Sequence, residues 1–187
     1  MFLRITSGLY GGLRVSVPET EIRPTEEKVR AAIFNILFSM VDFEESSFAD
    51  LFAGSGAVGI EALSRGFSFA GFFDNNKKTV ANIRKNLSAL KIKDDFIVVE
   101  SNSFTIGMLI ECGRIYDVIF IDPPYKMIEK IPALIEEIIA NRIVSENGII
   151  IVETGAPFAF VVDGFGKTEK KYGNTFLNFY RKNNERN

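Results

Sequence analysis

From residue 47 onward, short apolar runs alternate with segments in which apolar residues recur at helical spacing. The clearest run, Ile149-Ile150-Ile151-Val152, is continuous rather than alternating, which is typical of a strand buried on both faces. The pattern predicts strands at 47–52, 68–73, 96–100, 117–121 and 148–153, and helices at 57–65, 76–90, 104–111 and 128–140. Alternation of this kind indicates an α/β protein with a parallel, doubly wound sheet.

The two ends of the chain depart from this alternation. Near the carboxyl terminus, residues 167–172 and 175–182 flank Gly173-Asn174, which predicts a turn and an antiparallel closing hairpin. Near the amino terminus, residues 2–22 alternate loosely between several glycines and predict a small hairpin-like extension with little core of its own.

A further helix is predicted between this extension and the first strand of the alternation. Thr25 is a candidate N-cap, and Glu26 and Glu27 follow it in the first turn, where the helix dipole favours acids. The apolar residues behind them recur on one face of the helix: Val29, Ile33, Ile36, Leu37 and Met40.

Composition indicates one ordinary domain, because 187 residues with 47% hydrophobic content can bury a single core. The formal net charge of -2 argues against a generally basic nucleic-acid binder. Positive charge gathers at the chain ends, however. Residues 1–14 hold two arginines and no acid, and residues 167–187 hold six Lys and Arg against two Glu.

One cysteine, Cys112, excludes an internal disulfide, and the absence of histidine removes imidazole as a metal ligand or general base. We therefore expect no metal, and chemistry that rests on carboxylates, backbone groups and aromatic rings. The sequence has no apolar core of signal-peptide length and no run long enough to span a membrane, so we expect a cytoplasmic protein.

The segment from Asp50 to Gly59 joins a predicted strand to a predicted helix through a glycine turn. Gly54, Gly56 and Gly59 have the spacing of a nucleotide-binding loop, which serves NAD, FAD and S-adenosylmethionine and also occurs as a plain strand-to-helix turn. Asp50 would repel a pyrophosphate but complements the ammonium and sulfonium of S-adenosylmethionine. The alternative for Asp50 is a solvated acid at the strand end.

Polar residues also end the next two predicted strands. Asp74, followed by Asn75, lies about 20 residues beyond the glycine loop, where a carboxylate can accept hydrogen bonds from both ribose hydroxyls. NAD would use such an acid as well. Asn102, within Ser101-Asn102-Ser103, can accept a hydrogen bond from an adenine amino group through its side-chain oxygen.

The predicted strand at 117–121 ends in Asp122-Pro123-Pro124-Tyr125. The two prolines fix φ and remove two donors, so the Asp122 carboxylate and the Pro123 carbonyl can form a rigid, acceptor-only rim. Tyr125 adds a flat ring beside them. An exocyclic amino group on a planar base needs acceptors for its hydrogens and a ring for stacking, whereas the alternative is a proline-rich turn that merely closes a strand.

At this point the chain resembles the bacterial 16S ribosomal RNA guanine-N2 methyltransferases, which depend on S-adenosylmethionine. The resemblance spans nearly the whole length, and its motifs occur in the family's order: Arg4-Ile5-Thr6-Ser7-Gly8, Arg23-Pro24-Thr25, Val29-Arg30, Phe34-Asn35-Ile36-Leu37, Asp50-Leu51-Phe52-Ala53-Gly54-Ser55-Gly56, Asp122-Pro123-Pro124-Tyr125 and Tyr172-Gly173-Asn174-Thr175. The Asp122-Pro123-Pro124-Tyr125 motif alone is shared with adenine-N6 DNA methyltransferases. Its combination with Arg23-Pro24-Thr25 is more specific to the rRNA enzymes.

The resemblance implies a Rossmann-like, doubly wound, mostly parallel seven-stranded methyltransferase sheet with an antiparallel C-terminal hairpin strand. It implies an RNA-facing hairpin extension at 1–22, with Arg4 and Arg14 as RNA-binding residues, and a methyltransferase domain at 23–187. It places the catalytic residues at 122–125, and the cofactor-binding residues at Arg23, Thr25, Asp50, Phe52, Ala53, Gly54, Ser55, Gly56, Asp74, Asn75, Asn102 and Ser103. The extension is less basic than is usual in the family, since Leu9, Gly11 and Leu13 stand where basic residues are common.

The expected activity is methyl transfer from S-adenosylmethionine to guanine N2 of 16S rRNA, by a monomer acting on an assembling small ribosomal subunit. Three alternatives stay open. An adenine-N6 DNA methyltransferase would use the same four residues at 122–125, although 187 residues leave no separate target-recognition domain. An NAD-binding oxidoreductase would use the glycine loop, and a non-catalytic module would bind the cofactor without turnover.

Overall fold

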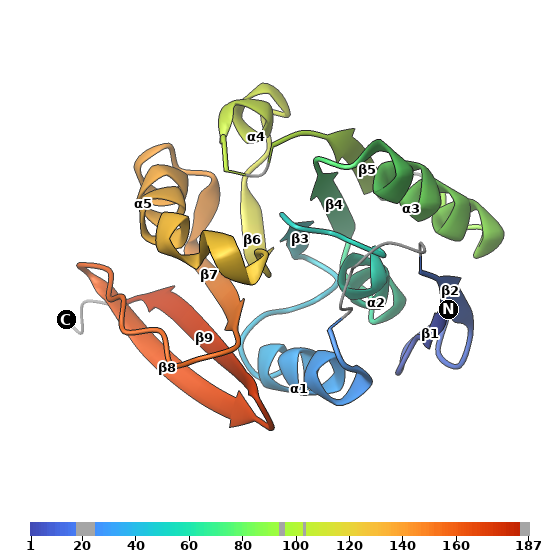
Figure 1. The fold of residues 1–187 in the computed structure, drawn as a ribbon, viewed down its shortest axis with the longest axis horizontal. Coiled ribbons are helices and arrows are strands. Elements are labelled where there is room, and N and C mark those ends of the chain that lie inside the picture. The colour runs from blue at the N-terminus through green and yellow to red at the C-terminus, as the bar shows by residue number, and fades with distance from the viewer. Residues whose placement is uncertain (18–24, 94–95, 103, 184–187) are drawn as a thin grey trace. The chain divides into compact units, whose positions relative to one another are not determined.

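The computed structural model describes residues 1–17, 25–93, 96–102 and 104–183. The chain forms two compact units, residues 1–103 and 104–187. Its seven-stranded sheet has the strand order β5-β4-β3-β6-β7-β9-β8, and a separate two-stranded sheet is formed by β1 and β2 (Figure 1). Among the described residues, no helix has the length and apolar character needed to cross a bilayer.

The first unit contains the parallel strands β3 (Ser47–Asp50), β4 (Phe69–Asp74) and β5 (Phe96–Glu100). The helix α2 (Ala57–Ser64) connects β3 to β4, and α3 (Lys77–Ala89) connects β4 to β5. These elements match the predicted ranges closely. All four residues of β3 are buried, as expected for a strand covered on both faces.

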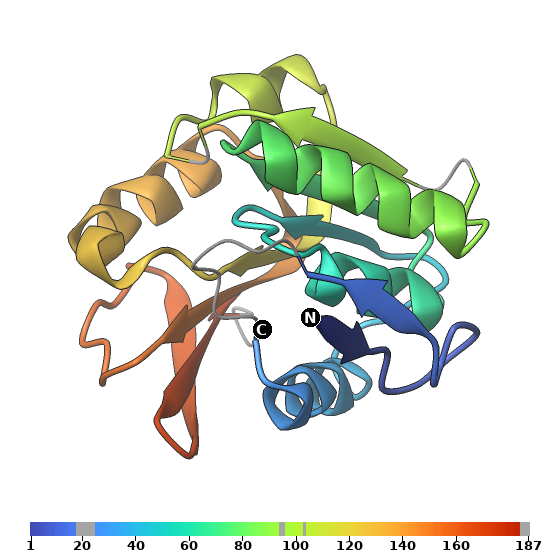
Figure 2. The ribbon, with the colours of Figure 1, turned by 45° about the vertical axis from the view of Figure 1, so that its right-hand side comes forward.

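The amino-terminal hairpin consists of β1 (Phe2–Arg4) and β2 (Arg14–Ser16), which pair antiparallel. Ile5 and Val15 have exposed fractions of 1% and 0%, because they pack in one apolar cluster with Ile60 of α2 and Ile83 of α3. Figure 2 shows the hairpin beside these two helices. The apolar side of the hairpin is therefore buried against the body of the first unit.

The predicted N-cap of the first helix is wrong. The helix α1 spans Glu27–Leu37, its N-cap is Glu26, and that side chain makes no capping hydrogen bond. Thr25 is instead buried, and its carbonyl accepts a hydrogen bond of 2.6 Å from Nη1 of Arg30. The helix also ends at Leu37, so the predicted apolar stripe stops before Met40.

The second unit contains β6 (Tyr116–Ile121), β7 (Val144–Thr154), β8 (Phe165–Tyr172) and β9 (Thr175–Lys182). Strands β6 and β7 are parallel, whereas β9 pairs antiparallel with both β7 and β8, which confirms the predicted C-terminal hairpin. The sheet as a whole confirms the predicted mostly parallel, seven-stranded class with antiparallel C-terminal strands.

Two predicted helices of this unit are shorter than expected. The helix α4 spans only Gly107–Glu111. The segment predicted as one helix divides into a 3-10 helix η1 (Tyr125–Lys130) and the α-helix α5 (Ile131–Ala140). Pro132 lies in the first turn of α5, where its missing N–H costs no helical hydrogen bond, so it favours a helix start at this point.

Candidate active site

Each of the three glycines at the junction of β3 and α2 is explained by the structure. Gly54 and Gly56 have φ angles of 51° and 78°, and Gly56 is the left-handed N-cap of α2. Gly59 lies inside the helix, where a Cβ would come within 2.3 Å of the Phe72 ring on β4. Two glycines therefore form the turn and the third allows close packing of helix on strand, as in nucleotide-binding loops.

Asp50, at the end of β3, is 1% exposed. Its Oδ2 atom accepts a hydrogen bond of 3.3 Å from the backbone N–H of Gly59 in the first turn of α2. A carboxylate at this position complements the positive end of the helix dipole. The alternative of a solvated strand-end acid is therefore wrong, and the carboxylate is fixed beneath the glycine loop.

Asp74, at the end of β4, is half-buried and is held at both carboxylate oxygens. Oδ2 accepts from the N–H of Gly54 at 2.9 Å, and Oδ1 accepts from the N–H of Asn76 at 2.8 Å. Burial raises the pKa of the Asp74 carboxyl above its ordinary value, and the hydrogen bonds from Asn76 and Gly54 oppose that rise. The carboxylate is thus oriented directly beside the loop.

The other predicted cofactor residues differ in exposure. Asn75 and Asn102 are exposed, Phe52 and Gly54 are half-buried, and Ala53, Ser55 and Gly56 are buried. Asn76, which the prediction omitted, caps α3 through its side chain, which accepts from the N–H groups of Lys78 and Thr79. Arg23 and Ser103 lie outside the described residues, and Thr25 is buried.

Asn86 of α3 connects the glycine loop to the hairpin and was missed by the sequence analysis. This carboxamide is 4% exposed. Its Oδ1 accepts from both N and Oγ of Ser16, and its Nδ2 donates to the carbonyls of Ser16 at 2.9 Å and Ser55 at 3.3 Å. Asn82, one turn earlier, also binds Ser16. A helical asparagine carries no local signal of such long-range contacts.

Glu61 of α2 holds the other end of the hairpin. This carboxylate is fully buried and accepts hydrogen bonds from the N–H groups of Thr6 and Ser7 at 2.8 and 3.1 Å, and from the Thr6 hydroxyl. Arg65 forms an ion pair with it at 2.9 Å. The hairpin is therefore fastened by polar contacts at both ends, and this leaves Arg4 and Arg14 directly opposite one another and exposed.

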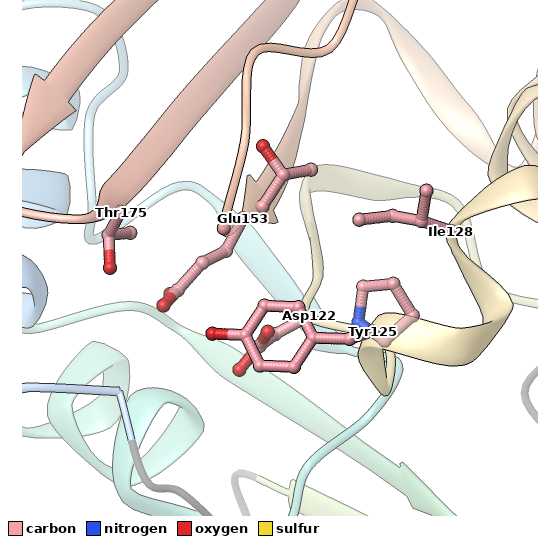
Figure 3. A pocket seen from close by; sticks show the side chains of 8 residues that line it. Asp122, Tyr125, Ile128, Glu153 and Thr175 are labelled. Carbon is pink, nitrogen blue, oxygen red and sulfur yellow. The ribbon is translucent and has the colours of Figure 1, made fainter.

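In the second unit, a pocket forms around the Asp122-Pro123-Pro124-Tyr125 segment (Figure 3). Asp122 is half-buried, Pro123 is buried, and Tyr125 is 65% exposed at the start of η1. The pocket is small, with about 10 Å³ accessible to the centre of a water molecule, and it opens to solvent. Its lining residues are Asp122, Pro123, Tyr125, Ile128, Glu153, Thr154, Gly155 and Thr175.

The end of β7 supplies pocket residues that the sequence analysis did not select. Glu153 lines the pocket with Asp122. Gly155 provides space for the Tyr125 ring, since a Cβ at Gly155 would lie 2.4 Å from Cε1 of that ring. The signal was present in the sequence, because an acid and then a glycine end the apolar run 149–152, as Asp50 and then Gly54 do at the first strand.

Solved structures with this architecture define the class of protein. The putative methyltransferase yhhF from Escherichia coli has a TM-score of 0.81 and 26% identity, covering 99% of this chain and 100% of its own. The putative methylase HI0767 from Haemophilus influenzae has a TM-score of 0.78 and 26% identity, covering 97% and 99%. The chain has the Rossmann-like methyltransferase fold, which implies S-adenosylmethionine as methyl donor and confirms the predicted cofactor.

The family model described as conserved hypothetical protein 95 matches residues 3–181, and the chain belongs to this family. It is 36% identical over 155 residues to the putative rRNA methyltransferase YlbH of Bacillus subtilis, covering 81% of this chain and 82% of the relative. It is 32% identical over 155 residues to ribosomal RNA small subunit methyltransferase D of Escherichia coli K12, covering 81% and 74%. The predicted resemblance is therefore confirmed at the level of the family.

Proposed function

We propose that this protein transfers a methyl group from S-adenosylmethionine to the exocyclic N2 of a guanine in 16S ribosomal RNA. The observation that carries the proposal is the pocket at the end of β6. There, Asp122, Pro123 and the Tyr125 ring line a space that has carboxylate acceptors and an aromatic face. The names of the curated relatives support rRNA of the small subunit as the substrate.

The cofactor is assigned to the first unit. When bound, it supplies a methyl group on a cationic sulfonium. Asp74 would bind the ribose hydroxyls, because its carboxylate is already oriented by the Gly54 and Asn76 amides and each oxygen keeps acceptor capacity. The glycine loop would allow close approach of the backbone, Asp50 would contribute negative charge beneath it, and Asn102 would accept from the adenine amino group.

The target base is assigned to the pocket of the second unit. The Asp122 carboxylate and the Pro123 carbonyl would accept the amino hydrogens and direct the nitrogen lone pair, while Tyr125 stacks on the base at a gain of about 1–3 kcal/mol. The base must leave its helical stack to reach such a pocket, so a single-stranded or locally opened region is the substrate. Orientation and electrostatic alignment then supply the catalysis without a covalent intermediate, and the Asp122 carboxylate would accept the proton that N2 loses as it gains the methyl group.

The hairpin is the proposed RNA-facing element. Arg4 and Arg14 stand opposite one another across β1 and β2, an arrangement in which like charges destabilise a sheet. An RNA phosphate near both guanidinium groups would remove this repulsion. We place the reaction in the cytoplasm, on an assembling small subunit, with the protein acting as a monomer.

Mass spectrometry of rRNA nucleosides tests the proposal. Cells that lack the gene should lose N2-methylguanosine from one site of 16S rRNA, and the wild-type protein should restore it where Asp122→Ala does not. Unchanged N2-methylguanosine would refute the guanine-N2 assignment. Transfer to adenine N6 of DNA by the purified protein would favour the DNA alternative, and thermal stabilisation by NAD rather than adenosylhomocysteine would favour the oxidoreductase.

A further inference from the structure

We infer that Glu153 selects guanine over adenine by accepting a hydrogen bond from the N1–H of the target base. This inference rests on the proposed function, and it adds a base-reading residue outside the Asp122-Pro123-Pro124-Tyr125 segment. Glu153 is half-buried near the end of β7 and lines the same pocket as Asp122 and Tyr125. Figure 3 shows both carboxylates directed into the space beside the Tyr125 ring.

Two acceptor-only side chains line this pocket beside the hydroxyl groups of Tyr125, Thr154 and Thr175. Asp122 and Glu153 each present a carboxylate. The Pro123 carbonyl would be a third acceptor, as in the proposed function. The Thr154 hydroxyl donates to the carbonyl of Ala156 at 2.7 Å, so its proton is already used within the protein. A carboxylate has about four acceptor sites, which leaves capacity for a ligand beside contacts with the protein.

Guanine and adenine differ in the donors and acceptors on their Watson–Crick edges, and a pocket lined by carboxylates can distinguish them by this difference. The Watson–Crick edge of guanine carries three hydrogens, one on N1 and two on N2, so it is matched by two carboxylates and a carbonyl. Adenine has an amino group as well, but its N1 is an acceptor. Adenine would therefore place its N1 lone pair against a carboxylate, and it would lose a hydrogen bond to a charged group that guanine makes.

The backbone around Glu153 is rigid enough to enforce this difference. The residue follows Ile149–Val152, which are fully buried, and it pairs in register with Leu177 of β9, while β7 is also paired with β6. Two residues further on, Gly155 contacts the Tyr125 ring. The end of β7 thus positions both Glu153, which would accept a hydrogen bond from the base, and Gly155, which leaves space for the Tyr125 ring.

The test compares guanine with 2-aminopurine at the methylated position of the rRNA substrate. The analogue keeps the 2-amino group but has no hydrogen on N1. The wild-type protein should methylate guanine with a kcat/KM about 100-fold above that for 2-aminopurine, whereas Glu153→Gln should reduce this ratio to about tenfold or less. Comparing the ratio between proteins cancels the difference in intrinsic reactivity of the two amino groups.

Glu136→Gln, an exposed change of the same type on α5, serves as the matched control and should keep the wild-type ratio. Glu153→Asp keeps the charge and should retain a preference for guanine at a lower rate. If the wild-type protein uses both bases equally, or if Glu153→Ala, which has no acceptor at this position, keeps the full wild-type ratio, Glu153 does not read N1–H. Absence of methylation of any guanine RNA by a wild-type protein that binds adenosylhomocysteine would instead refute the proposed function.

Discussion

Replacing Asn86 by Ala should weaken both the fold and cofactor binding, whereas replacing Asn82 should weaken only the fold. Asn86 makes four hydrogen bonds, three to Ser16 of the hairpin and one to the Ser55 carbonyl of the glycine loop. Asn82 makes two, both to Ser16. The two residues lie one turn apart on α3, so they form a matched pair that differs in the contact to the loop.

The magnitudes follow from these contacts. A neutral hydrogen bond contributes about 1 kcal/mol, and Asn86 is almost fully buried, so Asn86→Ala should lower the free energy of unfolding by about 3–4 kcal/mol. Asn82 is half-buried and Ser16 keeps its bonds to Asn86, so Asn82→Ala should cost about 1–2 kcal/mol. Urea unfolding measures both values.

Calorimetric titration with adenosylhomocysteine separates the two variants at the site. Loss of the bond to Ser55 leaves the glycine loop less restrained, so binding must pay more to order it. If this ordering costs about 1.4 kcal/mol of binding free energy, Asn86→Ala binds adenosylhomocysteine tenfold more weakly. Asn82→Ala should bind within about twofold of the wild type, by the same conversion. Equal affinities for the two variants would show that the contact between Asn86 and Ser55 has no part in arranging the loop.

Substitutions at four further positions test the site. Gly155→Ala should lower methylation about tenfold or more with unchanged adenosylhomocysteine affinity, because the new Cβ displaces the Tyr125 ring; normal turnover would mean that the ring position is unimportant. Asp122→Ala should abolish methylation and Asp122→Asn should retain part of it, both with normal calorimetric cofactor binding, whereas full activity of Asn with an unfolded Ala variant would indicate a structural role. Tyr125→Phe should keep most activity and Tyr125→Ala should lose much of it in the same assay, so an inactive Phe variant would implicate the hydroxyl instead of stacking. Asp74→Asn should weaken cofactor binding. Because the pKa of Asp74 is raised in the folded protein, its stabilising contribution is present below about pH 4 and is lost as pH rises through the folded pKa. Unfolding free energies should therefore show the wild type losing stability relative to Asp74→Asn as pH rises, and a constant difference would contradict the assigned shift.

The sequence alone determined the features that depend on neighbours along the chain. Continuous apolar runs located the parallel strands, because a strand buried on both faces needs apolar residues at every position. Two loops were identified from Gly54 and Gly56 and from the double proline after Asp122, because positive φ and missing donors are local backbone properties. Gly173-Asn174 likewise marked the turn of the final hairpin.

The tertiary structure decided what depends on residues far apart in the sequence. Thr25 is a residue type that is common at helix N-caps. In the structure, however, its carbonyl accepts a hydrogen bond from Arg30, and the helix begins at Glu27 with Glu26 as its N-cap. Asp50 could be solvated or buried on sequence grounds, and only its contact with Gly59 distinguishes the two. Asn86 meets a serine 70 residues away. Such contacts leave no periodic or motif signal, since they arise from the packing of whole elements, which local propensities do not encode.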